Sequence, residues 1–215
     1  MVDILYEDNH LLVVNKPINV ASQLDQSNDK DLLSLLKDFL VKKYNKPGDA
    51  YLGLIHRLDR PVGGVMVFAK TSKAASRLSD QMRRNSFTKI YQVVCEKEIK
   101  PQILEDYLIK DRKTNTSYVV DKNHPSGKYA KLEILSSTTK DNLSHLTVQL
   151  ITGRSHQIRV QLSSRNHPIW GDQRYNPQAK VGQQIALFAS SLSFDHPTTK
   201  ERLTFSCEPS LYPFV

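Results

Sequence analysis

A run of strand-like segments between residues 89 and 151, with no helical segment among them, is the strongest constraint on how this chain folds. Each segment is rich in β-branched and other apolar residues and is bounded by polar or turn-forming residues, which is typical of β-strands. The segments are residues 89–96, 104–109, 128–135 and 143–151. Consecutive strands with few helices predict an α+β fold with a mixed, mostly antiparallel central sheet and flanking helices.

Helical patterns flank this run on its N-terminal side. Apolar residues recur at helical spacing over residues 32–44, after the candidate caps Asp29 and Asp31. A second helix is predicted to follow with Thr71 or Ser72 as its cap.

The remaining apolar runs are predicted to form further strands. They are residues 4–6, 11–15, 64–70, 185–194 and 202–207. The chain has no repeat, no Ser/Gly linker and no abrupt change in composition. We therefore predict a single domain over residues 1–215, and the 39% of apolar residues suffice for its core.

The charge balance favours an anionic partner. The chain carries 30 Lys+Arg against 22 Asp+Glu, a formal net charge of +8, and such an excess attracts polyanions because neutralised phosphates release counterions. Cys95 and Cys207 have neither metal-binding spacing nor a disulfide framework. No apolar stretch is long enough to span a membrane, and the acidic N-terminus lacks signal-peptide features. We expect a reducing compartment, the cytoplasm.

One segment, HRLDRPVGG at residues 56–64, concentrates groups that can carry chemistry. Asp59 stands between Arg57 and Arg60, and nearby cations favour an ionised carboxylate and lower its pKa. The two following glycines permit a tight turn and the close approach of another backbone. A carboxylate held there can act as nucleophile or base. The alternative is an ordinary surface ion pair in a loop.

The chain resembles the RluA-type pseudouridine synthases, because HRLD and several other motifs occur in that family's order. The other motifs are NKP at 15–17, KIY at 89–91, TGRSHQIRV at 152–160, HPIWGDxxY at 167–175 and LSFDHP at 192–197. The resemblance implies the family's catalytic fold and isomerisation of uridine to pseudouridine in structured RNA, either tRNA or rRNA. It also implies no cofactor, no metal and no DNA partner, and we expect a monomer. The small N-terminal RNA-binding domain of longer relatives is not expected.

The resemblance also assigns roles to individual residues. It makes Asp59 the catalytic aspartate, Tyr91 the base-stacking tyrosine and Arg159 the arginine that pairs with the aspartate. Arg57 corresponds to the arginine that, in some relatives, enters the RNA stack where the uridine was. Leu187 corresponds to an apolar residue that lines the uracil pocket.

The predicted short helix near Ser155 supports a site role for Arg159. His156, Arg159 and Ser163 would share a polar face, opposite an apolar face. Arg159 could then hold Asp59 by a two-pronged hydrogen bond. The alternative for Arg159 is phosphate binding or a solvent-facing helix. His156 and Arg154 are assigned to substrate binding, although His156 could equally fix the loop.

Strand alternation gives Tyr91 a face in common with Lys89 and Val93. An aromatic ring on such a face can stack with an extruded base, although a packing tyrosine fits the same pattern. Asp172 could be a second carboxylate or a metal ligand. We predict instead a structural turn in which Asp172 accepts local backbone hydrogen bonds.

Departures from the family pattern keep two rival functions open. Residues 62–64 are VGG where longer relatives have TSG, and Gln161 and Phe188 stand where histidines are common. These changes bear on substrate choice and pocket lining. The first rival is a non-catalytic RNA-binding or RNA-folding protein on the same scaffold. The second is a metal-dependent nuclease that uses Asp59, Asp172 and the histidines.

Overall fold

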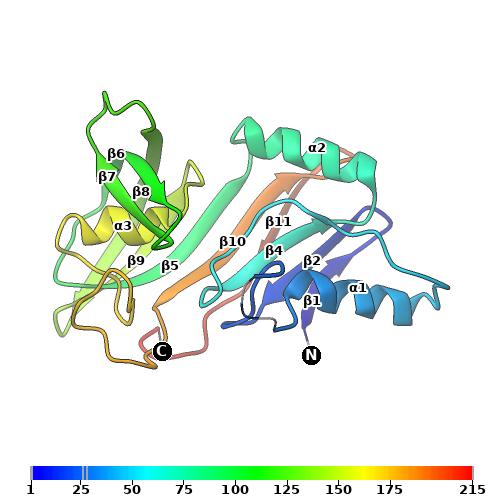
Figure 1. Ribbon diagram of the computed structural model, residues 1–215, viewed down its shortest axis with the longest axis horizontal. Coiled ribbons are helices and arrows are strands. Elements are labelled where there is room, and N and C mark those ends of the chain that lie inside the picture. Colours follow the sequence, from blue (N-terminus) through cyan, green and yellow to red (C-terminus); the bar gives the residue numbers. More distant parts are fainter. Residues whose placement is uncertain (1, 26, 28, 215) are drawn as a thin grey trace. The chain divides into compact units, whose positions relative to one another are not determined.

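A computed structural model describes residues 2–25, 27 and 29–214, and these residues divide into two compact units (Figure 1). Unit 1 comprises Met1–Thr88 and Ala189–Glu208, and unit 2 comprises Lys89–Phe188 and Pro209–Val215. Two of the three boundaries between the units therefore fall inside strands, β5 (Thr88–Glu96) and β10 (Leu187–Asp195), and the third falls between Glu208 and Pro209. A single domain over residues 1–215 stays a prediction. No described helix has the length and apolar character needed to cross a membrane.

Unit 1 is built on antiparallel strand pairs with two helices. Its elements are β1 (Asp3–Glu7), β2 (Leu11–Lys16), α1 (Leu32–Lys43), β3 (Gly53–Leu54), β4 (Gly63–Ala69), α2 (Ser72–Arg83), the part of β10 from Ala189 onward, and β11 (Arg202–Ser206). β2 pairs with β1 and β4, β3 pairs with β4, and β10 pairs with β11. β4 is buried along its whole length, as its apolar sequence predicts.

The helices of unit 1 begin where their caps predict. The Asp31 side chain accepts a hydrogen bond from the Ser34 amide, and the Thr71 side chain accepts one from the Ala74 amide. α1 buries one row of leucines, and α2 packs on a core to which the three strands β2, β4 and β10 contribute. That core comprises Leu11, Val13, Val65, Val67, Ala69, Ala74, Leu78, Phe87, Leu192 and Phe194.

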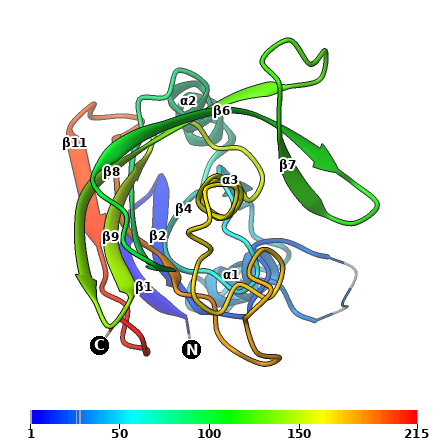
Figure 2. The same ribbon diagram turned by 90° about the vertical axis from the view of Figure 1, so that its left-hand side faces the viewer.

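Unit 2 contains the predicted run of strands. Its elements are β5 from Lys89, β6 (Gln102–Asp111), β7 (Thr116–Val120), β8 (Lys128–Lys140), β9 (Leu143–Leu150), α3 (Gln157–Ser163) and the first two residues of β10. The strands pair antiparallel in the order β5-β9-β8-β6-β7. Figure 2 shows α3 inside the curve of β6, β8 and β9. Val160 of α3 packs there against Leu108 and Ala130.

The N-terminal hairpin is fixed by side chains from distant parts of unit 1. Asp8 accepts hydrogen bonds from the amides of His10 (2.7 Å) and Leu11 (2.6 Å), which closes the predicted turn. The imidazole Nε2 of His196, in the HP motif, lies 2.8 Å from the other oxygen of Asp8. The LSFDHP motif thus ties β10 to the hairpin, a structural role that the sequence did not reveal.

Glu7 forms a second cluster on this hairpin and carries a stability prediction. Its carboxylate lies 2.7 Å from the ammonium groups of both Lys43 and Lys70, and it accepts a hydrogen bond from Tyr44. Burial alone would raise the pKa of Glu7, but these three donors outweigh it and lower the pKa to about 2. A carboxylate with a depressed folded-state pKa stabilises the fold above its unfolded pKa, and this stabilisation is lost as pH falls.

We therefore expect the wild-type protein to lose roughly 2–3 kcal/mol more unfolding free energy than Glu7→Gln between pH 5 and pH 2. Urea unfolding of both proteins at several pH values in this window measures the difference. Asp38→Asn, which alters an exposed pair with Lys30, is the control and should track the wild type. Parallel curves for wild type and Glu7→Gln would contradict the prediction.

Candidate active site

Hydrogen bonds hold the loop that carries Asp59 on the N-terminal side of this residue. The hydroxyl of Ser22 donates to the Leu58 carbonyl at 2.8 Å and accepts from the Leu58 amide at 3.1 Å. Leu58 is itself buried. On the other side, the Val62 amide donates to the Asp59 carbonyl at 3.0 Å and closes a turn. The backbone around Asp59 is therefore fixed by its neighbours in the sequence and by a buried serine.

Lys16, from the NKP motif, braces the same loop from inside unit 1. Its side chain is fully buried, and its ammonium group donates to the carbonyls of Pro17 (3.0 Å), Val20 (2.5 Å) and Arg60 (3.1 Å). The pKa of Lys16 is lowered to about 8, mainly by burial; the negative charge of Asp59 opposes this shift and the positive charge of Arg60 adds to it. Lys16 thus supplies Asp59 with a buried cation. Only the NKP motif itself pointed to Lys16, and it did not indicate this role.

The Arg60 guanidinium pairs with carboxylates other than that of its sequence neighbour Asp59. We expected a cation beside Asp59, but the Arg60 guanidinium pairs with Asp25 through two nitrogens (2.9 and 3.1 Å) and with Asp29 (2.8 Å). These bonds tie the segment before α1 to the active-site loop. Arg57 is exposed to solvent.

Gly64 meets the expectation that a glycine in this segment allows another backbone to approach. Its φ is +124°, in the left-handed region, and an added Cβ would lie 2.2 Å from the carbonyl oxygen of Ala189 in β10. No other residue fits there without displacing a strand. This glycine is therefore required where β4 approaches β10.

In unit 2, the β5–β9 pairing brings two motifs to the same end of the sheet. The strands are antiparallel, with Ile90 opposite Gln149 and Tyr91 opposite Val148. The KIY segment at the start of β5 therefore lies beside the end of β9, from which the loop 151–156 leads into α3 (Figure 1). Lys89, Tyr91 and Val93 are all buried, so their shared face is confirmed.

The loop before α3 is held by a glutamine whose role we did not anticipate. The Gln157 carbonyl oxygen accepts from the Thr152 hydroxyl (2.8 Å) and the Arg154 amide (3.0 Å). Its amide nitrogen donates to the carbonyls of Lys131 (3.1 Å) and of the Gln161 side chain (3.0 Å). Both glutamines are buried, and their spacing of four residues on one helix face is the signal that could have indicated this.

Arg159 makes a two-pronged ion pair, but its partner is Asp172. Nε and Nη2 lie 2.8 and 2.7 Å from the two carboxylate oxygens, and both side chains are almost entirely buried. The guanidinium carbon lies 5.2 Å from the ring centroid of Tyr175. Asp172 also accepts from the Arg174 amide (3.1 Å), so the predicted local backbone bond exists. Nε and Nη2 of Arg159 thus bind Asp172, and the bond from Arg159 to Asp59 stays a prediction.

His156 belongs to the same network. It adopts a left-handed conformation (φ 53°) immediately before α3, so the helix begins at Gln157 rather than near Ser155. The Tyr175 hydroxyl accepts from the Ser117 amide at 2.7 Å and shares a 2.8 Å hydrogen bond with Nδ1 of His156. This geometry supports the alternative in which His156 fixes the loop.

Comparison with known proteins decides the family. The family model described as RNA pseudouridylate synthase matches residues 10–164. The chain belongs to this family. It is 32% identical over 204 residues to the uncharacterized RNA pseudouridine synthase YhcT of Bacillus subtilis, with 93% of this chain and 66% of YhcT covered. It is also 32% identical over 228 residues to the dual-specificity RNA pseudouridine synthase RluA of Haemophilus influenzae, with 96% and 92% covered.

Solved structures confirm the fold of this pseudouridine synthase. Human RNA pseudouridylate synthase domain containing 4 superposes with a TM-score of 0.77 at 23% identity, covering 96% of this chain and 88% of that one. The α+β fold class, the RluA-type family and the class of RNA pseudouridine synthase, an isomerase, are thus confirmed.

The predicted site residues of the synthase are distributed over both units. Asp59 and Arg57 belong to unit 1, whereas Tyr91, Arg159 and Leu187 belong to unit 2. Tyr91 and Leu187 are buried, with 9% and 6% of their surface exposed.

The substrate-binding residues Arg154 and His156 also belong to unit 2. Arg154 is exposed, and its Nε donates to the Tyr129 carbonyl at 2.8 Å. His156 and Arg159 come together through Tyr175. The roles of all seven residues in catalysis and substrate binding stay predictions.

Proposed function

We propose that this synthase isomerises uridines in structured tRNA or rRNA with Asp59, Tyr91 and Arg159 as its catalytic set. The observation that carries the proposal is the bracing of Asp59. Lys16, Ser22 and the turn at Val62 fix the backbone around Asp59, while its carboxylate interacts with the buried ammonium group of Lys16. A group held in this way needs little reorganisation during the reaction.

The proposed reaction is an isomerisation that needs no external donor. The bond between C1′ and N1 of the uridine breaks, the uracil turns, and a bond forms between C1′ and C5. The proton on C5 is lost and N1 is left protonated, so atoms and electrons balance. Asp59 assists by attacking C1′, by attacking the uracil ring or by removing a sugar proton, and the phenol of Tyr91 can help to remove the C5 proton.

Recognition is proposed to depend on extrusion of the uridine from the RNA. Extrusion costs a few kcal/mol of unstacking free energy. Stacking of the uracil on Tyr91 offsets part of this cost, and insertion of the exposed Arg57 into the vacated position offsets more. Leu187, buried at the start of β10, is proposed to line the uracil pocket.

Arg159 is proposed to act from a fixed position. The Asp172 carboxylate aligns its guanidinium, and Tyr175 packs against it. An arginine held by two hydrogen bonds keeps one orientation, which suits a group that must face a carboxylate or a phosphate. Because both oxygens of Asp172 accept from Arg159, this carboxylate is not arranged as a second catalytic acid.

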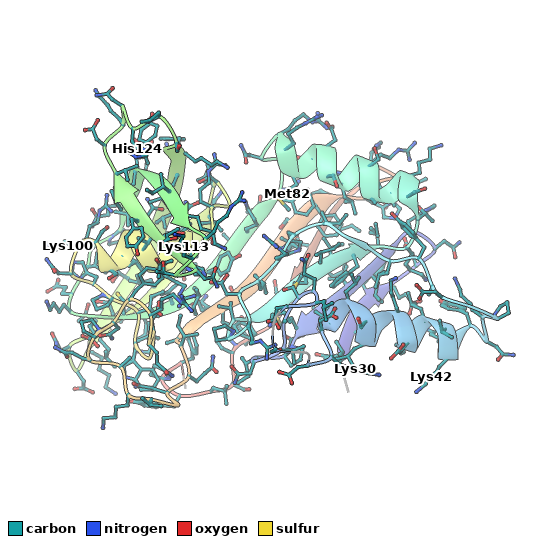
Figure 3. The ribbon with its side chains drawn as sticks, in the orientation of Figure 1. Lys30, Lys42, Met82, Lys100, Lys113 and His124 are labelled. Atoms are coloured by element: carbon teal, nitrogen blue, oxygen red, sulfur yellow. The ribbon has the colours of Figure 1, made fainter. Side chains whose placement is uncertain are left out.

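Phosphate contacts are proposed to supply most of the affinity, which makes binding sensitive to salt. Lys110, Arg112 and Lys113 are exposed on β6 and the turn that follows it, and Figure 3 labels Lys113. Arg83 and Arg84 are also exposed, but both pair with Asp80, and we expect a smaller contribution from them.

RNA affinity should fall at least about tenfold between 50 and 200 mM salt. Filter binding of labelled tRNA to the Asp59→Ala protein, which cannot turn over, measures this fall. The charge-removing variant Lys113→Met should make RNA affinity fall less steeply with salt concentration. An RNA affinity of the Asp59→Ala protein that does not change between about 50 and 200 mM salt would refute the proposed mode of binding.

Release of tritium from RNA labelled at uracil C5 tests the proposed activity, because only formation of the new carbon–carbon bond displaces that label. The proposal predicts release that persists in the presence of a chelator and leaves the RNA intact. RNA binding without release would favour the non-catalytic rival, and chelator-sensitive cleavage would favour the nuclease.

The target is proposed to be a stem-loop of tRNA or rRNA in the cytoplasm, with the synthase acting as a monomer. Similar relatives include the ribosomal large subunit pseudouridine synthase D of Zymomonas mobilis (30% identical, 96% of this chain and 68% of that protein covered). Mapping of pseudouridines in RNA from cells with and without the gene identifies the site. A set of sites that does not change on deletion would refute this choice of substrate.

A further inference from the structure

A buried lysine and a neighbouring arginine in unit 2 have no acidic partner. Lys89 retains only 6% exposure on β5, yet among the described residues its ammonium group makes no hydrogen bond or ion pair. Arg154 is anchored through Nε to the Tyr129 carbonyl, and in the described part of the chain no carboxylate pairs with its terminal nitrogens. The nearby Lys131, by contrast, pairs with Glu105 at 3.0 Å.

The strand pairing of unit 2 explains why Lys89 and Arg154 lie close together. Lys89 lies at the start of β5, next to the end of its antiparallel partner β9, and Gly153 and Arg154 follow β9 in the chain. A Cβ placed on Gly153 would lie 3.9 Å from the Lys89 ammonium nitrogen and would meet nothing else within 4 Å. Gly153 is exposed. The ammonium group of Lys89 therefore lies beside an unfilled position on the surface, which a side chain at residue 153 would occupy.

A cation in this environment is costly without a counter-charge. Burial, together with the positive charge of Arg154, lowers the pKa of Lys89 to about 8. The folded protein therefore holds the ammonium group of a mostly buried lysine next to a second cation. An anion bound at Gly153 would contact both groups and relieve the repulsion. A singly charged phosphodiester matches two converging donors.

We propose that Lys89, Gly153 and Arg154 form a subsite for one backbone phosphate of the RNA strand, next to the uridine that stacks on Tyr91. The proposal rests on the proposed function, which places the uracil on Tyr91, two residues along β5 and on the same face as Lys89. Lys89 is then a residue that binds substrate and sets the register of the strand relative to Tyr91.

Direct observation of the lysine tests the subsite without any need for turnover. The protein is labelled with carbon-13 at the lysine ε-carbons, and the Lys89 signal is identified by its loss in Lys89→Met. Titration with inorganic phosphate and with the dinucleotide UpU should shift this signal to saturation and raise the pKa of Lys89, with UpU effective at lower concentration. Lys100, which is exposed (Figure 3), is the internal reference and should not shift. Equal shifts of Lys89 and Lys100, or none, would overturn the subsite.

Kinetics on labelled RNA provide the second test. Lys89→Met keeps most of the unbranched side chain without its charge, and should raise KM about ten- to a hundredfold with kcat within about threefold. It should also lower the salt slope of binding by about 0.7, as expected for one phosphate of a single strand. Lys100→Met should change KM less than about twofold. A fall in kcat with an unchanged KM would overturn phosphate binding in favour of a catalytic role for Lys89.

The two proposals fail in different ways. Saturable binding of UpU at Lys89 in a protein that releases no tritium would refute the synthase activity and leave the subsite standing. Tritium release, together with a Lys89 signal that does not shift on addition of UpU, would refute the subsite and leave the activity standing.

Discussion

Asp59→Asn is expected to lower the rate of pseudouridine formation by at least about 10⁴-fold, as loss of a central catalytic group does in other enzymes. The fold should survive, because the contacts of Ser22 and Val62 in this loop are made to backbone atoms rather than to the Asp59 side chain. Tritium release measures the rate, and urea unfolding and filter binding show that structure and RNA affinity are retained.

Asp25→Asn is the matched control for this experiment. It makes the same chemical change at an exposed carboxylate that holds Arg60 beside the active-site loop. We expect less than a tenfold loss of activity, because Asp29 still holds the Arg60 guanidinium. Continued release of label by Asp59→Asn at a rate near that of Asp25→Asn would show that Asp59 is not the catalytic carboxylate.

Asp172→Asn is expected to lower the free energy of unfolding by about 3–5 kcal/mol, because it removes a buried carboxylate charge that pairs with the buried Arg159 guanidinium. The two groups are 7% and 0% exposed, so water cannot replace the lost partner. We also expect a large loss of activity, because the guanidinium is no longer held in one orientation. Urea unfolding measures the first effect and tritium release the second.

A double variant separates stability from catalysis at this pair. Arg159→Met combined with Asp172→Asn removes both charges of the buried pair, and should regain a large part of the lost stability. Activity should remain lost, because the proposed role of Arg159 needs its guanidinium. Recovery of turnover in the double variant would show that the pair has only a structural role.

Most elements of the fold could be predicted from local sequence patterns. The caps Asp31 and Thr71 mark real helix starts, and the apolar run 64–70 becomes the buried β4. β7 was missed because Thr116–Val120 is a short strand on the sheet edge, with exposed apolar side chains that show no clear alternation. β8 extends five residues beyond the predicted end because a polar sequence pairs with β9 there.

The motifs select candidate site residues, whose roles stay predictions, but they do not reveal the partners of these residues. Asp172 pairs with Arg159, for example, and this pairing depends on how the turn after α3 returns to that helix. Lys16, Gln157 and Gln161 are polar, so hydrophobic patterns do not mark them as buried. Lys16 and Gln157 donate to backbone carbonyls brought close by the fold, which no local pattern encodes.

The discontinuous composition of unit 1 has a consequence for synthesis on the ribosome. Its core is completed by Leu192 and Phe194, which leave the ribosome more than one hundred residues after β2, β4 and α2. At ordinary translation rates the apolar faces of those early elements stay uncovered for roughly 5–20 s. The contiguous residues 89–188 can collapse during this interval. The segment that is translated first is therefore the last to reach its native state, and nascent chains depend on protection from aggregation during that time.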